Sequence, residues 1–141
     1  MTPREQEIQR RTELSESRVT KAVFPPTTNH HNTLFGGTAL AWMDEVSFIA
    51  ATRFCRLPLV TVSSDRIDFK HAIPAGSIVE LVGRVIRVGN TSLQVEVNIY
   101  VESMYHDGRE KAVSGVFSFV AIGEDKKPVP VLAEFAAAPG S

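Results

Sequence analysis

Hydrophobic and polar residues follow a helical pattern in the first half of the chain and a strand pattern in the second half. Residues 38–54 contain no proline and no glycine, and apolar side chains would occupy nearly every side of the helix that they form. We expect such a helix to be buried on every side. Between Leu93 and Val101 apolar and polar residues alternate strictly, which predicts a strand with one buried and one solvated face.

Four further stretches are rich in apolar and β-branched residues and are bounded by glycine, proline or polar turns, so we predict a strand in each. They are residues 18–24, 59–69, 77–88 and 112–122. The last is apolar on both faces, as expected for a strand in the centre of a sheet. Gly89-Asn90 and His106-Asp107-Gly108 are typical of the turns between neighbouring strands.

The order of these elements predicts an α+β fold. One strand precedes the long helix, and four strands joined by short turns follow it, which favours antiparallel neighbours. A five-stranded antiparallel sheet can bury one long helix by wrapping around it, and this is the hot-dog fold. Because a single sheet would enclose the helix only in part, we predict that a second copy of the chain completes the burial. The protein is then at least a homodimer.

The length of 141 residues predicts one domain. We assign residues 18–132 to this single hot-dog domain. Residues 1–17 are mostly charged and polar, which predicts a loose N-terminal segment. Residues 133–141 are rich in alanine and contain a proline, which predicts a flexible C-terminal tail.

Composition excludes several classes of protein. Lys and Arg number 15 against 16 Asp and Glu, so the chain lacks the basic excess of a protein that coats nucleic acid. The single cysteine, Cys55, permits neither an intramolecular disulfide nor a zinc site of several cysteines, and the four histidines lack the spacing of a helical metal site. There is no apolar run long enough for a signal peptide or a membrane span, so we expect a cytoplasmic protein with no bound metal.

Asp44 is the strongest candidate for a chemical role, because it lies in the middle of the predicted apolar helix. A lone buried carboxylate needs partners, a raised pKa or a water-filled cleft. One face of the helix combines this carboxylate with several small residues, which leaves room for a ligand. Its members are Leu40, Ala41, Asp44, Ser47, Phe48 and Ala51. The alternative is structural: Asp44 or Glu45 lies at a solvated edge or pairs with an arginine of another subunit.

Residues Phe35-Gly36-Gly37 precede the predicted helix and form the second candidate. Two glycines let the backbone approach a ligand closely, and the free N–H groups of a helix N-terminus favour a negatively charged oxygen. Such groups could hold the oxyanion of a carbonyl under attack. A tight turn without a ligand is equally compatible with the spacing. Asn29 and Asn32 could orient water or a carbonyl, although asparagine is also common in loops.

Two blocks of sequence carry a resemblance to a known family. Residues 29–37 read NHHNTLFGG and are followed by AWMDE at 41–45, and residues 87–93 read RVGNTSL. Together they resemble the hot-dog acyl-CoA thioesterases, in particular the small bacterial acyl-CoA hydrolases related to the brain acyl-CoA hydrolase. The resemblance covers roughly residues 17–132. It implies hydrolysis of acyl-CoA thioesters to free coenzyme A and a carboxylic acid.

The resemblance also implies roles for individual residues. Asp44 corresponds to the helix carboxylate that acts as general base on water or as nucleophile, and Asn29 corresponds to a second catalytic residue. Asn32 stands where the family usually has glycine, and its side chain could itself reach the site. The backbone amide of Gly37 would polarise the thioester carbonyl. In this family the aspartate and the asparagine of one site belong to different subunits, and dimers often assemble further, as a trimer of dimers.

Substrate contacts follow from the same resemblance. The turn from Arg87 to Ser92 resembles the segment that lies along the pantetheine and phosphates of coenzyme A. The residues that we assign to substrate binding are Gly36, Arg87, Gly89, Thr91, Ser92 and Lys126, with Arg84 and Lys127 as further candidates for phosphate contacts. Coenzyme A is part of the substrate, and we expect no separate cofactor.

Two other functions stay open at this point. A hydratase or dehydratase of acyl thioesters would pair a histidine with a carboxylate, and His30 and His31 lie near Asp44 in the sequence. A sensor that binds acyl-CoA without turnover would need no water-activating carboxylate. The acyl chain length, the choice between general base and covalent mechanism, and any regulation by nucleotides do not follow from these residues.

Overall fold

Five strands form one antiparallel sheet in the order β1-β3-β4-β5-β2, and the computed structural model describes residues 1–135 of the chain. The elements are α1 (Pro3–Ser15), β1 (Ser17–Ala22), α2 (Gly36–Cys55), β2 (Leu59–Phe69), β3 (Ser77–Val88), β4 (Ser92–Ser103) and β5 (Glu110–Ala121), with short 3₁₀ turns at Pro25–Thr27 and Ala133–Phe135. The predicted bounds of β2 and β3 are confirmed, and the other strands differ from prediction by one or two residues at their ends.

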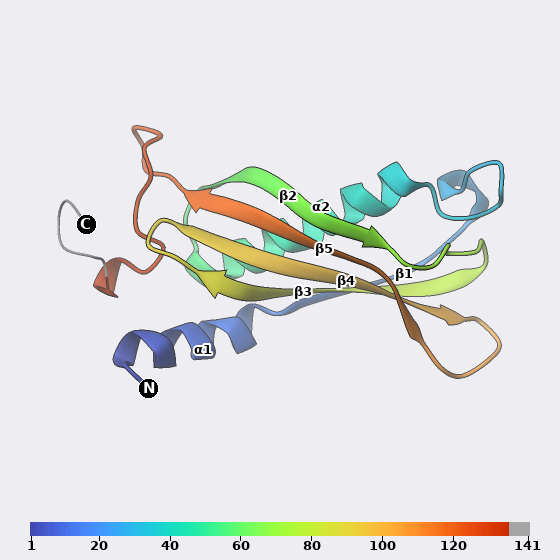
Figure 1. The fold of residues 1–141 in the computed structure, drawn as a ribbon, viewed down its shortest axis with the longest axis horizontal. Coiled ribbons are helices and arrows are strands. Elements are labelled where there is room, and N and C mark those ends of the chain that lie inside the picture. The colour runs from blue at the N-terminus through green and yellow to red at the C-terminus, as the bar shows by residue number, and fades with distance from the viewer. Residues whose placement is uncertain (136–141) are drawn as a thin grey trace.

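The long helix α2 lies across one face of the sheet, and the other face carries no helix among the described residues (Figure 1). Within the sheet its main contacts are with β1, β3 and β4, whereas the edge strand β2 lies outside them, and α1 also packs against it. A Cβ atom at Gly83 of β3 would lie 3.0 Å from Val46 Cγ1, so glycine permits this close approach of helix and sheet. The predicted five-stranded antiparallel sheet around one long helix is confirmed.

The helix begins two residues earlier than predicted and includes both glycines of the Phe35-Gly36-Gly37 segment. Neither glycine has a positive φ, so the pair does not form a left-handed turn. Glycine destabilises a helix most in its interior, because it loses more conformational freedom than other residues. Here the two glycines lie in the first turn. At the other end, Arg56 closes α2 in the left-handed conformation with φ 53°.

The prediction that α2 is buried on every side is wrong for the single chain. A sheet covers one side of a helix, and here the opposite side is exposed to solvent. The residues on this exposed stripe are Leu40, Ala41, Asp44, Glu45 and Phe48. Ser47 and Ala51, which the sequence places on the same face, are fully buried within the chain. The open side of α2 agrees with the expectation that a second copy is needed.

Residues 1–17 are not a loose segment, because Pro3–Ser15 form the helix α1. Thr2 Oγ1 accepts a hydrogen bond from the Glu5 amide at 3.1 Å and caps the helix. Hydrogen bonds from Arg10 and Arg11 lower the pKa of Glu7 to about 2. The helix has too few apolar residues for a pattern to reveal it. Of the predicted tail, residues 133–135 form a 3₁₀ turn and residues 136–141 lie outside the described residues.

Candidate functional site

Asp44 lies on the exposed stripe of α2, so its carboxylate is not buried within one chain as predicted. Its backbone carbonyl accepts a hydrogen bond from Ser47 Oγ at 2.7 Å. Within residues 1–135 neither Asp44 nor Glu45 has an ion-pair partner. The carboxylate of Asp44 is therefore free to act on water or on a ligand that approaches this side of the helix.

The first turn of α2 presents three unused donors. Phe35 precedes the helix and gives no side-chain cap, and the first intrahelical bond runs from the Ala39 amide to the Phe35 carbonyl at 3.0 Å. Within the described chain the amides of Gly36, Gly37 and Thr38 have no acceptor. A Cβ atom at Gly36 would meet nothing within 4 Å, so the space beside it is open. This helix end can bind a negatively charged oxygen.

The loop before α2 is organised by Asn29. Its Oδ1 accepts hydrogen bonds from the His31 amide at 2.9 Å and from the Thr33 amide and hydroxyl, both at 3.2 Å. The side-chain NH₂ of Asn29 has no acceptor among residues 1–135. Its oxygen is thus committed to the loop, while its two N–H donors remain available.

The backbone conformation at Asn32 gives a structural reason for asparagine at this position, which the sequence did not show. Its φ is +62°, in the left-handed region that glycine adopts without cost and that asparagine tolerates better than most residues. Its amide donates to the Asn29 carbonyl at 3.0 Å, and its carbonyl accepts from the Ala75 amide at 2.9 Å. The side chain is exposed. This backbone geometry explains why asparagine is tolerated at a place that favours glycine.

The β3–β4 turn holds the second group of predicted residues. Arg87, Gly89 and Ser92 line a hollow of about 400 Å³ on the face of the sheet opposite α2, together with polar side chains of neighbouring strands. Those neighbours include Ser63, Asp65, Gln94 and Ser118. Lys126 lies in a separate tight turn with φ +63° and does not line the hollow, and Arg84 is within 3.9 Å of Glu16 instead.

The two groups of predicted residues lie at opposite ends of the same chain (Figure 1). The Leu34 amide bonds to the carbonyl of Ile73, just before β3 begins, so the N-terminus of α2 is at that end. The Thr91 carbonyl bonds to the Ala121 amide, and the next residue, Ile122, bonds to Pro58, just after α2 ends. Because α2 has 20 residues, it is about 30 Å long. One chain does not bring the groups together.

Other titratable groups offer no comparable site in the part of the chain that the structure describes. The rings of His30 and His31 lie 3.9 Å apart with a tilt of 43°, both residues are exposed, and neither forms a hydrogen bond or ion pair with Asp44. The closest histidine–carboxylate pair joins His71 and Glu110 at 3.9 Å, both exposed. Burial raises the pKa of the Cys55 thiol, in agreement with a structural role. No three His, Cys, Asp or Glu side chains of residues 1–135 form a group that could hold a metal ion.

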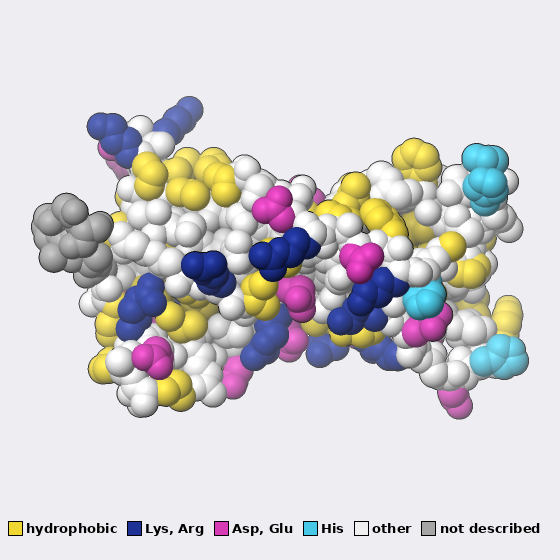
Figure 2. All heavy atoms as spheres, in the orientation of Figure 1, with side chains coloured by type: hydrophobic (Ala, Val, Ile, Leu, Met, Phe, Trp, Pro, Cys, Tyr) yellow, Lys and Arg dark blue, Asp and Glu magenta, His cyan; other side chains and the backbone are white. Residues whose placement is uncertain are grey.

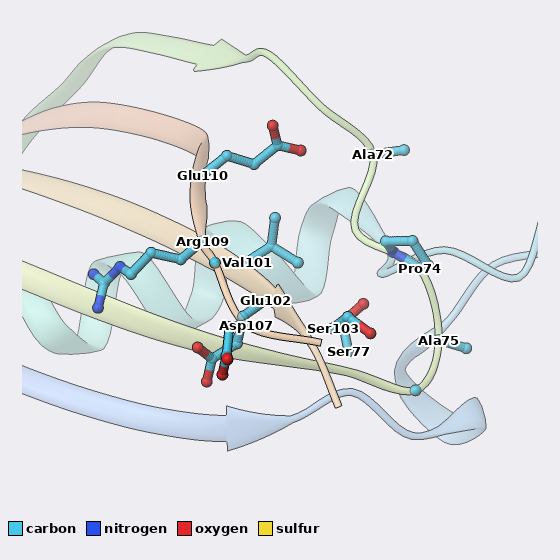
Figure 3. A pocket seen from close by; sticks show the side chains of 12 residues that line it. Ala72, Pro74, Ala75, Ser77, Val101, Glu102, Ser103, Asp107, Arg109 and Glu110 are labelled. Carbon is cyan, nitrogen blue, oxygen red and sulfur yellow. The ribbon is translucent and has the colours of Figure 1, made fainter. Parts of the chain in front are cut away.

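A hollow of about 550 Å³ lies between the β2–β3 connection and the β4–β5 loop (Figure 3). Glu102, Asp107 and Glu110 line it, while the side chain of Arg109 extends away along the sheet toward Glu80, at 2.9 Å. None of the predicted site residues lines this hollow. Basic and acidic side chains also alternate across the middle of the sheet's solvent face (Figure 2). Neither helix of the described residues is long and apolar enough to span a membrane.

Comparison with known proteins identifies a family. The model of the Thioesterase superfamily matches residues 31–105. An acyl-CoA thioester hydrolase of Bacillus subtilis is 42% identical over 118 residues, which are 82% of this chain and 69% of that protein. Among solved structures, an acyl-CoA hydrolase from Staphylococcus aureus in complex with butyryl coenzyme A and coenzyme A is similar with a TM-score of 0.81 and 34% identity, over 84% of this chain and 73% of that one.

A hexameric acyl-CoA thioesterase is also similar, with a TM-score of 0.81 and 35% identity over 84% of this chain and 76% of that chain. Structures of the Staphylococcus aureus enzyme include variants in which an asparagine, an aspartate or a threonine is replaced by alanine. The asparagine and the aspartate of that enzyme are separated by as many residues as Asn29 and Asp44, and its threonine follows the aspartate at the spacing of Thr61.

Thr61 is a residue that the sequence analysis missed. It lies in the edge strand β2 opposite Phe119, whose buried ring places this position on the face toward α2. Its side chain is exposed in the single chain. A threonine within an apolar strand carries no signal by itself, since threonine is common in strands for reasons of conformation alone.

Proposed function

Because this chain belongs to the thioesterase superfamily, we propose that it hydrolyses acyl-CoA thioesters at a site that two copies of the chain build together. Asp44 accepts a proton from water, and the water oxygen forms a bond to the thioester carbonyl carbon. The carbonyl oxygen becomes negatively charged in the tetrahedral intermediate. The C–S bond then breaks, and the sulfur leaves with a proton as free coenzyme A, while the acyl group leaves as a carboxylic acid.

Charge on the carbonyl oxygen is stabilised by donors that are already in place. The amides of Gly36, Gly37 and Thr38 have no acceptor within the described chain, and they lie at the positive end of the α2 dipole. The open space beside Gly36 admits a carbonyl group. The free NH₂ of Asn29 supplies a further donor. Fixed donors aimed at a developing charge account for a large part of catalysis in acyl transfer.

Within one chain the N-terminus of α2 and the β3–β4 turn lie at opposite ends. This separation is the observation that supports a site shared by two chains. The edge strand β2, where Phe69 is 52% exposed, pairs with β5, and the Phe119 ring of β5 lies 6.5 Å from the ring of Phe48, which is 46% exposed on the open side of α2. A two-fold axis at this edge buries these apolar side chains and reverses the direction of the second chain. The β3–β4 turn of one subunit then approaches the N-terminus of α2 of the other. Coenzyme A can contact the turn while its thioester reaches Gly36 and Asp44.

Thr61 joins this site in the proposed dimer. It lies on the α2 side of the edge strand, where the second subunit would pack. Its hydroxyl can both donate and accept a hydrogen bond, so it can orient the attacking water or Asp44. Further assembly into a trimer of dimers is supported by the similarity to a hexameric thioesterase. Independence from a cofactor and a cytoplasmic location stay predictions.

Replacing Asn32 by glycine is expected to preserve turnover within about twofold, because glycine adopts the same left-handed backbone without strain.

Replacing Asn29 by alanine is expected to lower turnover by an order of magnitude or more, because both the loop bonds and the free donor are lost. Thiol release from one acyl-CoA measures both variants. A large loss for Asn32→Gly with an intact fold would instead give Asn32 the catalytic role that the sequence suggested.

The proposal is tested by thiol release from acyl-CoAs of short to long chain, followed by complementation between inactive subunits. Asp44→Ala and Asn29→Ala chains are mixed by co-expression so that they pair at random. If Asp44 of one subunit works with Asn29 of the other, every mixed dimer has one intact site. Activity then recovers to about a quarter of the wild-type value, since half of the dimers are mixed and each has one of two sites.

Three results of these experiments would contradict a part of the proposal. No recovery, with mixed dimers present, places Asp44 and Asn29 of one site in the same chain and contradicts their placement on different subunits. No turnover of any acyl-CoA by the wild type, with acyl-CoA still bound, contradicts hydrolysis and favours the sensor. Hydration of an enoyl-CoA without thiol release would favour the hydratase.

A further inference from the structure

The β3–β4 turn is held from three directions by segments that are distant in the sequence. Arg4 of α1 donates from Nη2 to the Gly89 carbonyl at 2.8 Å. The Val131 amide bonds to the Asn90 carbonyl and the Ala121 amide to the Thr91 carbonyl, both at 2.9 Å. The Ser92 carbonyl accepts from the Gly89 amide at 2.8 Å. Every carbonyl from residue 89 to residue 92 therefore has a partner.

Apart from the Gly89 amide, several donors of this turn have no such partners among residues 1–135. The amides of Asn90 and Thr91 and the hydroxyls of Thr91 and Ser92 make no hydrogen bond there. A rigid turn that uses its carbonyls internally and leaves its donors free is suited to phosphate oxygens, which are acceptors only. The conformation of the turn depends on the groups that bind its carbonyls, and Arg4 is the one charged group among them.

The helix that carries Arg4 is itself anchored to the domain. Arg11 donates to Glu134 at 2.6 Å and to the carbonyl of Phe54 at the end of α2 at 3.4 Å. Thr12 and Ser15 are buried against the domain. Figure 1 shows α1 and the C-terminal 3₁₀ turn at the same end of the sheet as the β3–β4 turn. Arg4 therefore reaches Gly89 from a fixed helix rather than from a free segment.

We propose that Arg4 is a positioning residue for the substrate: through Gly89 it holds the β3–β4 turn in the conformation that binds the phosphates of coenzyme A. This inference rests on the proposed acyl-CoA hydrolysis. It makes α1, which lies before the residues matched by the family model, a determinant of affinity for the coenzyme A part of the substrate. The chemical step at Asp44 does not depend on it, because the turn binds the phosphates of coenzyme A, which take no part in the bond changes at the thioester.

The test compares Arg4→Met with Arg10→Met. Both arginines belong to α1, but Arg10 bonds only to Glu7 at the surface, so it is the matched control. For Arg4→Met we expect KM for acyl-CoA to rise about tenfold with kcat within about twofold, since a turn that is no longer pre-organised binds more weakly without changing the transition state for chemistry. Arg4→Lys is expected to restore part of the affinity. Arg10→Met is expected to leave KM unchanged.

A shortened substrate makes the test specific. An acyl thioester of N-acetylcysteamine has no phosphates, so its KM is expected to be the same for wild type and Arg4→Met. Calorimetry with coenzyme A alone should show the same weakening for Arg4→Met, and this measurement does not require turnover. An unchanged Kd and KM would overturn the inference, as would a rise in KM that is equal for both substrates.

Thr91→Ala combined with Ser92→Ala separates this inference from the proposed function. If this double variant raises KM and Arg4→Met does not, only the role of Arg4 is wrong. If neither change affects KM or the Kd of coenzyme A, the turn does not bind coenzyme A, and the proposed placement of the substrate fails as well. A fall in the melting temperature of Arg4→Met with unchanged affinity would assign Arg4 a purely structural role.

Discussion

Replacing Asp44 with alanine is expected to lower turnover of acyl-CoA by a factor of about 10²–10⁴, the range for loss of a general base. The fold should be unaffected, because the side chain is exposed and has no ion-pair partner within residues 1–135. Removing it therefore creates neither a cavity nor an unpaired buried group. Thiol release under substrate saturation measures the loss, and circular dichroism with thermal unfolding measures the fold.

Glu45→Ala is the matched control for this experiment. Glu45 is the neighbouring carboxylate on the same exposed stripe of α2, and it is replaced by the same residue. The turnover of the Glu45→Ala variant is expected to stay within about threefold of wild type, since a change of surface charge alone has a small effect. Equal losses for the two variants would show that the stripe needs negative charge rather than a base at Asp44. Unfolding of Asp44→Ala without selective loss of turnover would make its role structural.

Replacing Phe48 with glutamate is expected to dissociate the dimer and to remove activity with it. Phe48 is 46% exposed in the single chain and lies on the open side of α2, one turn after Asp44. In the proposed dimer its ring is buried, so glutamate loses apolar contact and places a carboxylate in an apolar interface, once for each subunit. We expect the dimer dissociation constant to rise by a factor on the order of 10³ or more. Sedimentation at several protein concentrations measures it.

Ile86→Glu provides the control for this change. Ile86 is 48% exposed and lies on β3, away from the open side of α2, so the exposed apolar area and the added charge are closely matched. The variant is expected to keep the dimer and its turnover. For Phe48→Glu, activity per subunit should increase with protein concentration, because mass action restores the dimer. Activity that is low at every concentration, in a protein that remains dimeric, would show that Phe48 acts on the reaction directly.

Most of the fold could be predicted because local patterns carry it. Strict alternation from Leu93 to Val101 identifies a strand with one buried face, and the apolar run without glycine from 38 to 54 identifies the long helix. The helix α1 could not be found in this way. It packs through Thr12, Ser15 and one partly buried apolar residue, Ile8, and these do not form an apolar period.

The candidate site was predictable only in part. Asp44 stands out because a carboxylate in an apolar helix is unusual, although its exposure in the single chain was only one of the alternatives that the sequence left open. The left-handed backbone of Asn32 depends on the Asn29 and Ala75 contacts, which lie beyond any local pattern. Thr61 became visible only through the spacing that it shares with the threonine replaced in a related enzyme. The roles of all these residues remain predictions.

The sequence by itself determined the elements, their order and the identity of the unusual carboxylate, because periodicity and turn chemistry act over a few residues at a time. The tertiary structure alone decided which groups come together. It placed the N-terminus of α2 and the β3–β4 turn at opposite ends of one sheet, left one side of α2 uncovered, and brought Arg4 of α1 onto the Gly89 carbonyl. These relations join residues up to 85 positions apart, and only the packing of helix on sheet fixes their distances.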